Sequence, residues 1–349
     1  MTPLSATAAI SPAFARVREA LVSPFRLGRS WKLAATCYIA VMGDPSMVAM
    51  CFLALPFLFL VPGKIKVFVL AIGLAVFAVS VVLFWVGSHL EFVVFDIASA
   101  RAQFVAPSWR RFAPVVWRWI GVKAIFALGI ALVCGVPCIF MVKHMIPLFA
   151  QASGANPSPA FFLQFLGIFA IVYLVFCVAL LFSSLLNDFF LPSFALEQVS
   201  MREAARRFAA LISSEPGQFF AYVGLKVLLA IVGFIAAYAV VLVCMIPLYI
   251  LFFIFMMVVT FSVHGIASQL FMIPAMICLE MGILYVSCAA YGALNLFLRC
   301  YAVYFLGGHY PMLGDLLDRS TPPPAAPPMY PPPGYFMPPP PPAEPAPNV

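Results

Sequence analysis

The sequence predicts an all-α fold, a polytopic transmembrane helical bundle of six or seven spans. Of its 349 residues, 65% are hydrophobic and only 9% are charged, whereas soluble domains carry about 25% charged residues. The mean hydropathy of +1.09 agrees, and the apolar stretches are long and do not alternate as barrel strands do. A soluble enzyme is excluded, because so few charged residues cannot cover a surface that faces water.

The apolar stretches set the expected spans, since a helix needs about 20 apolar residues to cross the hydrocarbon core. The first stretch is interrupted by Gly43-Asp44-Pro45, which predicts a broken helix. The region 246–306 fits either one span with a re-entrant hairpin or two spans, so the total is left at six or seven. The remaining crossings are expected at 46–62, 67–90, 119–142, 160–186 and 219–245.

Basic residues cluster in three segments between these spans, and the positive-inside rule assigns all three to the cytoplasm. We therefore expect a multi-pass protein of the bacterial cytoplasmic (inner) membrane with its N-terminus in the cytoplasm. A cytoplasmic C-terminus is also expected, although it depends on the span count. The segments contain Arg26, Arg29 and Lys32, then Arg101, Arg110, Arg111 and Arg118, then Arg202, Arg206 and Arg207.

Composition divides the chain into three parts. Residues 1–30 are expected to form an N-terminal amphipathic, interfacial segment, and residues 31–310 the transmembrane helical domain. Residues 311–349 are rich in proline, which removes backbone donors and favours a solvated polyproline tail. Such a tail either binds an aromatic-lined groove of a protein partner or is an inert extension.

An internal repeat of helical hairpins is predicted from the two central basic segments. Arg110-Arg111-Phe112-Ala113 recurs as Arg206-Arg207-Phe208-Ala209, and each is followed by a span that opens with Gly-x-Lys. The segment 201–212 is amphipathic and has a capping-box pattern. We favour cytoplasmic amphipathic elbow helices packed under the bundle, with lipid contact secondary. The candidate headgroup contacts are Arg110, Arg111, Arg202, Arg206 and Arg207.

Ionisable residues near the bilayer are functional candidates because a charge in lipid is costly. Glu91 is expected to pair with Lys123, and Asp188 with Lys226, so that each pair ties two neighbouring helices together. A proton or substrate relay, and lysines that snorkel to the surface, are the alternatives. Glu280 is the isolated case, since no Lys or Arg lies between Lys226 and Arg299. The candidate intramembrane polar residues are Glu91, Asp96, Lys123, Asp188, Lys226 and Glu280.

Motifs of catalysis are missing from the sequence. It has no phosphate-cradling glycine loop, no Gly-x-Ser-x-Gly and no His-Glu-x-x-His, and its four histidines are scattered. We expect no catalytic residue, no cofactor, no metal and no nucleic-acid partner, so the chain is not expected to be an enzyme. Membrane lipids and a protein bound to the tail are the expected partners, and the oligomeric state stays open.

Three stretches together resemble a family of bacterial multi-pass proteins that are described as similar to the membrane domain of glycerophosphoryl diester phosphodiesterases. The resemblance covers roughly residues 20–310 and implies a helical membrane domain with six spans and both termini in the cytoplasm. It does not imply phosphodiesterase activity, because the soluble barrel with its metal-binding carboxylates is missing. The stretches are 24–33, 88–96 and Phe190-Leu191-Pro192 with the Glu-Ala-Ala-Arg-Arg-Phe helix, and 297–306 resembles the family's C-terminal end.

Two functional hypotheses follow from the sequence. The first is a non-enzymatic integral membrane protein, a scaffold or accessory subunit whose cytoplasmic proline-rich tail binds a partner. The alternative is a transporter or lipid-handling protein that uses Glu280 as an intramembrane carboxylate. An enzyme acting on lipids is the least favoured.

Overall fold

The computed structural model of the chain describes residues 5–23, 26–46, 49, 65–100, 102, 104–152, 159–262 and 266–320. Every regular element among these residues is a helix. The helices are α1 (Ile10–Leu21), α2 (Leu27–Met42), α4 (Ile65–Ser99), α5 (Val105–Ala152), α6 (Pro159–Phe189), α7 (Leu191–Glu197), α8 (Met201–Ser214), α9 (Pro216–Ser262), α10 (Ile266–His309) and α11 (Pro311–Ser320).

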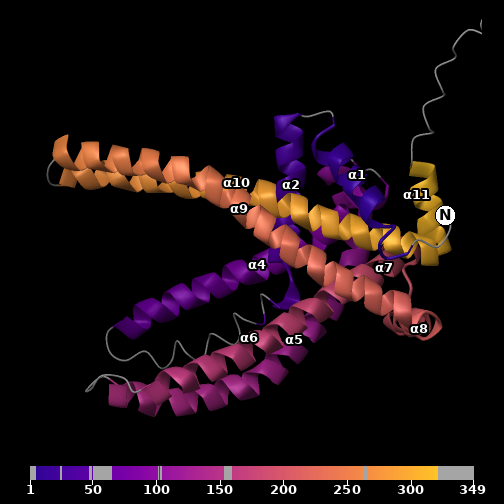
Figure 1. Ribbon diagram of the computed structural model, residues 1–349, viewed down its shortest axis with the longest axis horizontal. Coiled ribbons are helices and arrows are strands. Elements are labelled where there is room, and N and C mark those ends of the chain that lie inside the picture. Colours follow the sequence, from indigo (N-terminus) through magenta and orange to yellow (C-terminus); the bar gives the residue numbers. More distant parts are fainter. Residues whose placement is uncertain are drawn as a thin grey trace, which may run out of the picture.

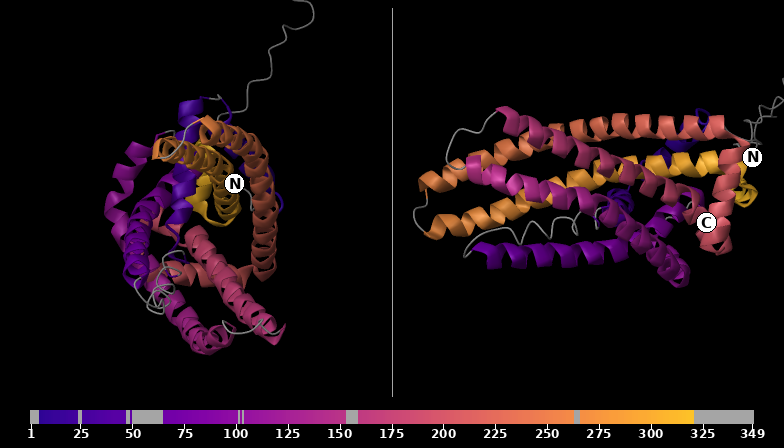
Figure 2. Two further views of the ribbon diagram at one scale, coloured as in Figure 1. Left: turned by 90° about the vertical axis from the view of Figure 1, so that its left-hand side faces the viewer. Right: turned by 90° about the horizontal axis from the view of Figure 1, so that it is seen from below.

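Three long arms extend from one packed end of the molecule. The arms are α4, the antiparallel pair α5 and α6, and the antiparallel pair α9 and α10, while α1, α7, α8 and α11 gather at the packed end (Figure 1). The right-hand view of Figure 2 shows the same separation of arm tips from the packed end. The longest helix has 48 residues, which is about 72 Å at 1.5 Å per residue. A hydrocarbon core is only about 30 Å thick, so such a helix crosses it obliquely or extends past it.

Five segments of the described residues are long and apolar enough to cross a membrane, which makes the chain compatible with a multi-pass membrane protein. They are Val67–Ser99, Val105–Val133, Tyr173–Glu197, Pro216–Ser262 and Leu270–His309. The expected crossing at 46–62 lies outside the described residues except for Ser46 and Ala49. The total of six or seven spans therefore stays a prediction.

The ambiguous region 246–306 comprises the last part of α9 and nearly all of α10, which together form one hairpin. Helix α9 continues through Pro247 to Ser262, and α10 returns from Ile266 to His309. Neither helix is divided into two spans, so the re-entrant hairpin expected as one alternative is not found in the described residues. Ser268 and Gln269, which belong to the polar patch of the sequence, lie in the first turn of α10.

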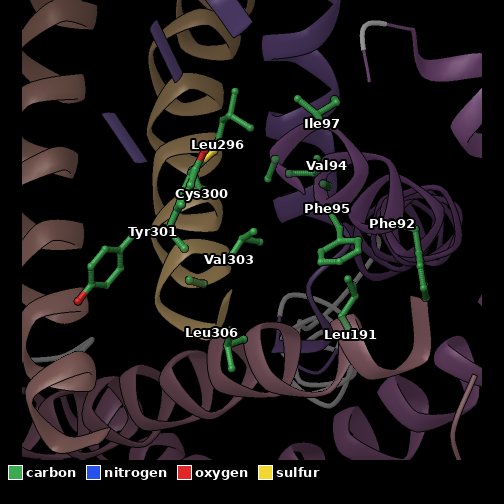
Figure 3. Packing of buried hydrophobic residues seen from close by; sticks show 14 of the residues in the cluster. Phe92, Val94, Phe95, Ile97, Leu191, Leu296, Cys300, Tyr301, Val303 and Leu306 are labelled. Atoms are coloured by element: carbon green, nitrogen blue, oxygen red, sulfur yellow. The ribbon is translucent and has the colours of Figure 1, made fainter. Parts of the chain in front are cut away.

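The apolar core lies at the packed end, where α4, α7 and α10 meet. Figure 3 shows Phe92 and Phe95 of α4, Leu191 of α7, and Val303 and Leu306 of α10 in this cluster. Along the arms, by contrast, most large apolar side chains are exposed. Exposed apolar surface of this extent suits contact with lipid tails.

The C-terminal boundary of the helical domain differs from the expected one. Residues 311–320, assigned to the proline-rich tail, form helix α11, which packs on α10, α4 and α7. Leu313 and Leu317 are four residues apart on one helix face and are almost fully buried. Burial of these two leucines favours a helix over residues 311–320, and the proline-rich composition that prevents a helix begins only after them. The proline-rich residues 321–349 lie outside the described residues.

The two expected repeats also differ in their elbows. Helix α8 is separate, and Ser200 caps it by accepting a hydrogen bond from the Glu203 amide at 3.3 Å, as the capping-box pattern predicts. Arg110 and Arg111, however, lie in the first turns of the continuous helix α5. The expected elbow helix of the first repeat is therefore not a separate element.

Candidate functional site

Glu91 and Lys123 form a buried ion pair between α4 and α5. The Lys123 Nζ lies 3.1 Å from Glu91 Oε1 and also donates to the Gly43 carbonyl at 2.7 Å. The indole nitrogen of Trp119, one turn before Lys123, donates to Glu91 Oε2 at 2.8 Å. Lys123 is fully buried, so it does not snorkel to the surface.

Asp188 and Lys226 form the corresponding pair between α6 and α9. The Lys226 Nζ contacts Asp188 Oδ2 and donates to the Ser184 hydroxyl at 2.6 Å. The Tyr222 hydroxyl, one turn before Lys226, donates to Asp188 Oδ2 at 2.8 Å. Both pairs expected from the sequence are therefore present, and each carboxylate also accepts from an aromatic side chain.

Arg299 of α10 lies between the two carboxylates. Its Nη1 is 3.4 Å from Asp188 Oδ1 and its Nη2 is 3.9 Å from Glu91 Oε1. Sequence reasoning used Arg299 as the end of a stretch without Lys or Arg and did not assign it to a site, because nothing in the local pattern places it beside residues more than 100 positions away. We call Glu91, Lys123, Asp188, Lys226 and Arg299 the charged layer.

Asp44 is a second residue that the sequence did not identify as part of the site. The break Gly43-Asp44-Pro45 lets its carboxylate accept from the Ser46 amide at 2.8 Å and from the Ser183 hydroxyl at 2.6 Å. A Cβ added at Gly43 would lie 2.5 Å from the Gly87 Cα, so this close approach of the chain after α2 to α4 requires glycine. The helix break thus positions Asp44 and the Gly43 carbonyl beside the charged layer.

A cavity of about 430 Å³ adjoins the charged layer. This volume is within the range of small-molecule sites, about 300–1,000 Å³. Phe234 lines the cavity and is also 56% exposed, so the cavity opens on the outer face of the arms. The lining side chains come from helices α2, α4, α6, α9 and α10 and from the residues that follow α2. The polar ones include Asp44, Glu91, Asn187, Lys226 and Arg299, and the apolar ones include Val41, Leu180, Leu294 and Leu298.

Two polar groups in the cavity wall have unused hydrogen-bonding capacity. The Oδ1 of Asn187 is buried and has no hydrogen-bond partner among the described residues. Arg299 carries five N–H donors, and one hydrogen bond is formed by its guanidinium, to Asp188. Asn295 is satisfied, since it donates to the Cys37 carbonyl at 2.6 Å. The wall therefore offers both an open acceptor and open donors to a ligand.

Two of the predicted polar residues lie away from the cavity. Asp96 pairs with Arg111 at 3.5 Å and accepts from Ser108 at 2.5 Å, at the packed end. Glu280 is exposed on α10 and does not line the cavity. It is 19 residues before Arg299, or about 28 Å along a helix, because α10 runs unbroken toward the hairpin tip. At this position Glu280 has no charged partner among the described residues that would support the intramembrane role expected of it.

The candidate headgroup arginines are mostly exposed. Arg110, Arg111, Arg202 and Arg206 all present their side chains to the surface. Arg207 instead ties α8 to α7, since it lies 2.8 Å from Glu197 and 3.2 Å from Glu203. The hydrogen bond from Arg207 holds the pKa of the Glu203 carboxyl below its usual value. This arrangement is the one expected of an elbow packed under the bundle.

No group of three or more metal-binding side chains occurs within the described part of the chain. What the cavity offers chemically is hydrogen bonding and charge. It presents carboxylates, an ammonium and a guanidinium, all oriented by neighbouring helices, next to apolar side chains.

Comparison with known proteins identifies one family. A model of a family of unknown function, DUF7544, matches residues 4–316. No curated protein and no solved structure matches the chain. A link to the membrane domain of glycerophosphoryl diester phosphodiesterases, which the sequence stretches resemble, is not shown by these comparisons.

Proposed function

The chain belongs to the DUF7544 family of unknown function, and we propose that it is a non-enzymatic multi-pass membrane protein that binds a membrane lipid in the cavity beside the charged layer. The single observation that carries this proposal is the mixed lining of the cavity. Charged and amide side chains line it together with leucines, a valine, a methionine, aromatic side chains and a serine.

The position of the opening supports a lipid ligand. Helix α6 packs mainly with α5 and α7, while α9 packs mainly with α10, and Figure 1 shows these two groups of helices parting away from the packed end. The cavity is lined by residues of both groups. Leu174 and Val178 of α6 are exposed on the arm leading away from it. An amphiphile with its polar head at Arg299 can extend its acyl chains along these surfaces without leaving the apolar phase.

This proposal retains the lipid-handling hypothesis from the sequence, but it places the binding site in the cavity instead of at Glu280. The scaffold hypothesis depends on a partner of the proline-rich tail, and that tail lies outside the described residues. We further propose that the packed end faces the cytoplasm of a bacterial inner membrane. The first turns of α5, which carry Arg111, and helix α8, which carries Arg207, lie at this same end, as the positive-inside rule requires of the cytoplasmic side.

Native mass spectrometry of the full chain, purified in mild detergent, tests the proposal. Leu180→Trp places a larger side chain in the cavity wall on α6. Leu174→Trp makes the same change on an exposed surface of α6 and serves as the control. We expect the wild type and the control to retain a bound phospholipid and Leu180→Trp to lose it. Equal retention by both variants, each eluting as a folded species, would refute the proposal.

A further inference from the structure

The charges around the cavity balance, and this balance restricts the head of the ligand. The charged layer has two carboxylates and three cations, and Asp44 adds a third carboxylate. The sum is therefore zero when all six groups are ionised. The two tyrosines in the lining, Tyr38 and Tyr291, are phenols and add no charge near neutral pH. A ligand head with a net charge would leave an uncompensated charge in a poorly solvated site, which is costly.

Within this neutral set the opposite charges are separated. Among the described residues, Asp44 accepts hydrogen bonds from Ser46 and Ser183, and no Lys or Arg of this part of the chain lies within ion-pair distance of it. Arg299 contacts Glu91 and Asp188 only at 3.9 and 3.4 Å, which are long separations for ion pairs. The cavity lining therefore contains a guanidinium with donors to spare and a carboxylate that has no cation within ion-pair distance among the described residues.

Asn187 supplies an independent indication of what is missing. Its Oδ1 is an acceptor without a partner, and the residue is 96% buried in the cavity wall, with a relative exposure of 4%. A buried acceptor is normally satisfied, so the site favours a ligand that donates hydrogen bonds as well as accepting them. Either orientation of the amide leaves a polar group at this point for a ligand to contact.

We propose that the cavity selects a zwitterionic aminophospholipid, whose phosphate binds Arg299 and whose primary ammonium binds Asp44 and Asn187. This inference rests on the proposed lipid-binding function and adds the class of headgroup. The phosphate accepts the open N–H donors of the guanidinium. The ammonium has three donors, enough for Asp44 and the free Asn187 oxygen, and the net charge of the occupied site stays at zero.

Competition between lipids of defined headgroup tests this inference. The full chain is placed in detergent micelles, and the retention of phosphatidylethanolamine, phosphatidylcholine and phosphatidylglycerol is compared by native mass spectrometry. Wild type is expected to prefer phosphatidylethanolamine to both others by about tenfold, the effect of one hydrogen bond to a charged group. Phosphatidylcholine lacks N–H donors on its head, and phosphatidylglycerol carries a net negative charge.

Asp44→Asn is the decisive variant, because it keeps the size of the side chain and one acceptor oxygen for the Ser46 amide or the Ser183 hydroxyl, and it raises the charge of the site by one unit. It is expected to reverse the order, so that phosphatidylglycerol binds more tightly than phosphatidylethanolamine. Asp315→Asn, at an exposed position of α11, is expected to keep the wild-type order. Should Asp44→Asn not fold, Asn187→Leu provides a second variant, expected to reduce the preference for phosphatidylethanolamine over phosphatidylcholine.

The outcomes separate the two proposals. Lipid bound without headgroup preference, or a wild-type order that Asp44→Asn leaves unchanged, overturns the assignment of the headgroup while the lipid-binding function stands. Preferential retention of phosphatidylglycerol by the wild type also overturns it. A wild-type chain that retains no phospholipid of any class overturns the proposed function itself.

Discussion

Trp119 and Tyr222 occupy the same position in two different hairpins. Each lies four residues before a buried lysine, and each donates a hydrogen bond to the carboxylate with which that lysine pairs. The two segments share the order aromatic-x-Gly-x-Lys, Trp119 to Lys123 and Tyr222 to Lys226. This shared geometry supports an internal repeat more strongly than the four-residue Arg-Arg-Phe-Ala match, since both the sequence order and the hydrogen-bonded carboxylate recur.

The Tyr222 hydroxyl is expected to stabilise the Asp188–Lys226 pair. Tyr222→Phe removes one donor to a buried carboxylate and is predicted to lower the free energy of unfolding by about 1.5–3 kcal/mol. Tyr249→Phe, at an exposed position of the same helix, is the control and should change it by less than about 0.5 kcal/mol. Equilibrium unfolding in mixed detergent micelles measures both, and equal values would contradict the assigned hydrogen bond.

The two members of the Asp188–Lys226 pair are expected to depend on each other. Lys226→Met alone leaves Asp188 buried with only Arg299 as a cation and is predicted to cost about 3–5 kcal/mol. Adding Asp188→Asn removes the uncompensated charge and should recover part of that loss. A double-mutant cycle on unfolding free energies gives the coupling. Additive effects of the two changes would show that they do not form a coupled pair.

The bridging role of Arg299 depends on its fork of donors. Arg299→Lys keeps the charge but replaces a planar fork with a single ammonium, which cannot contact Glu91 and Asp188 in the same way. We predict a loss of about 1–3 kcal/mol in stability. Arg319→Lys near the end of α11, where the arginine is exposed, is the matched change and should be neutral. If Arg299→Lys left the stability unchanged, the bridging role of Arg299 between Glu91 and Asp188 would be contradicted.

The close approach at Gly43 predicts opposite effects for two Gly→Ala changes. At Gly43 the added Cβ would lie 2.5 Å from the Gly87 Cα, so the backbone must shift at a cost of about 1–3 kcal/mol. At Gly129 on α5 nothing lies within 4 Å of the added atom, and alanine should stabilise the helix by about 0.5–1 kcal/mol. Thermal unfolding in detergent compares the two variants. The same sign for both would refute the close approach.

The sequence predicted those features that depend on residues close together in the chain. The positions of the long helices were predicted from apolar stretches, and the pairs Glu91–Lys123 and Asp188–Lys226 from charges near the same end of adjacent helices. The helices depend on consecutive residues, and the two pairs depend on long helices that follow one another in the chain. Arg299 and Asp44 were missed as site residues because their neighbours come from distant segments. The aromatic-x-Gly-x-Lys order was a signal that could have identified Trp119 and Tyr222.

Two further expectations had a different basis. Glu280 attracted attention because it is isolated in the sequence, but isolation says nothing about which face of a long helix a residue occupies, and the side chain is exposed. The tail was begun at 311 because prolines dominate the residues beyond it. The apolar positions of α11, Leu313 and Leu317, lie within four residues of each other and were too few to indicate a helix by periodicity alone.

Mapping the binding site with a photoreactive phospholipid tests the central claim most directly. The full chain, in bilayers that contain a phospholipid with a photoreactive group near its head, is irradiated, digested and analysed by mass spectrometry. The account predicts adducts on cavity-lining residues such as Leu180, Leu294 and Leu298, and their loss in Leu180→Trp. Adducts distributed only along the exposed arms, with none in the cavity and no change in Leu180→Trp, would contradict it.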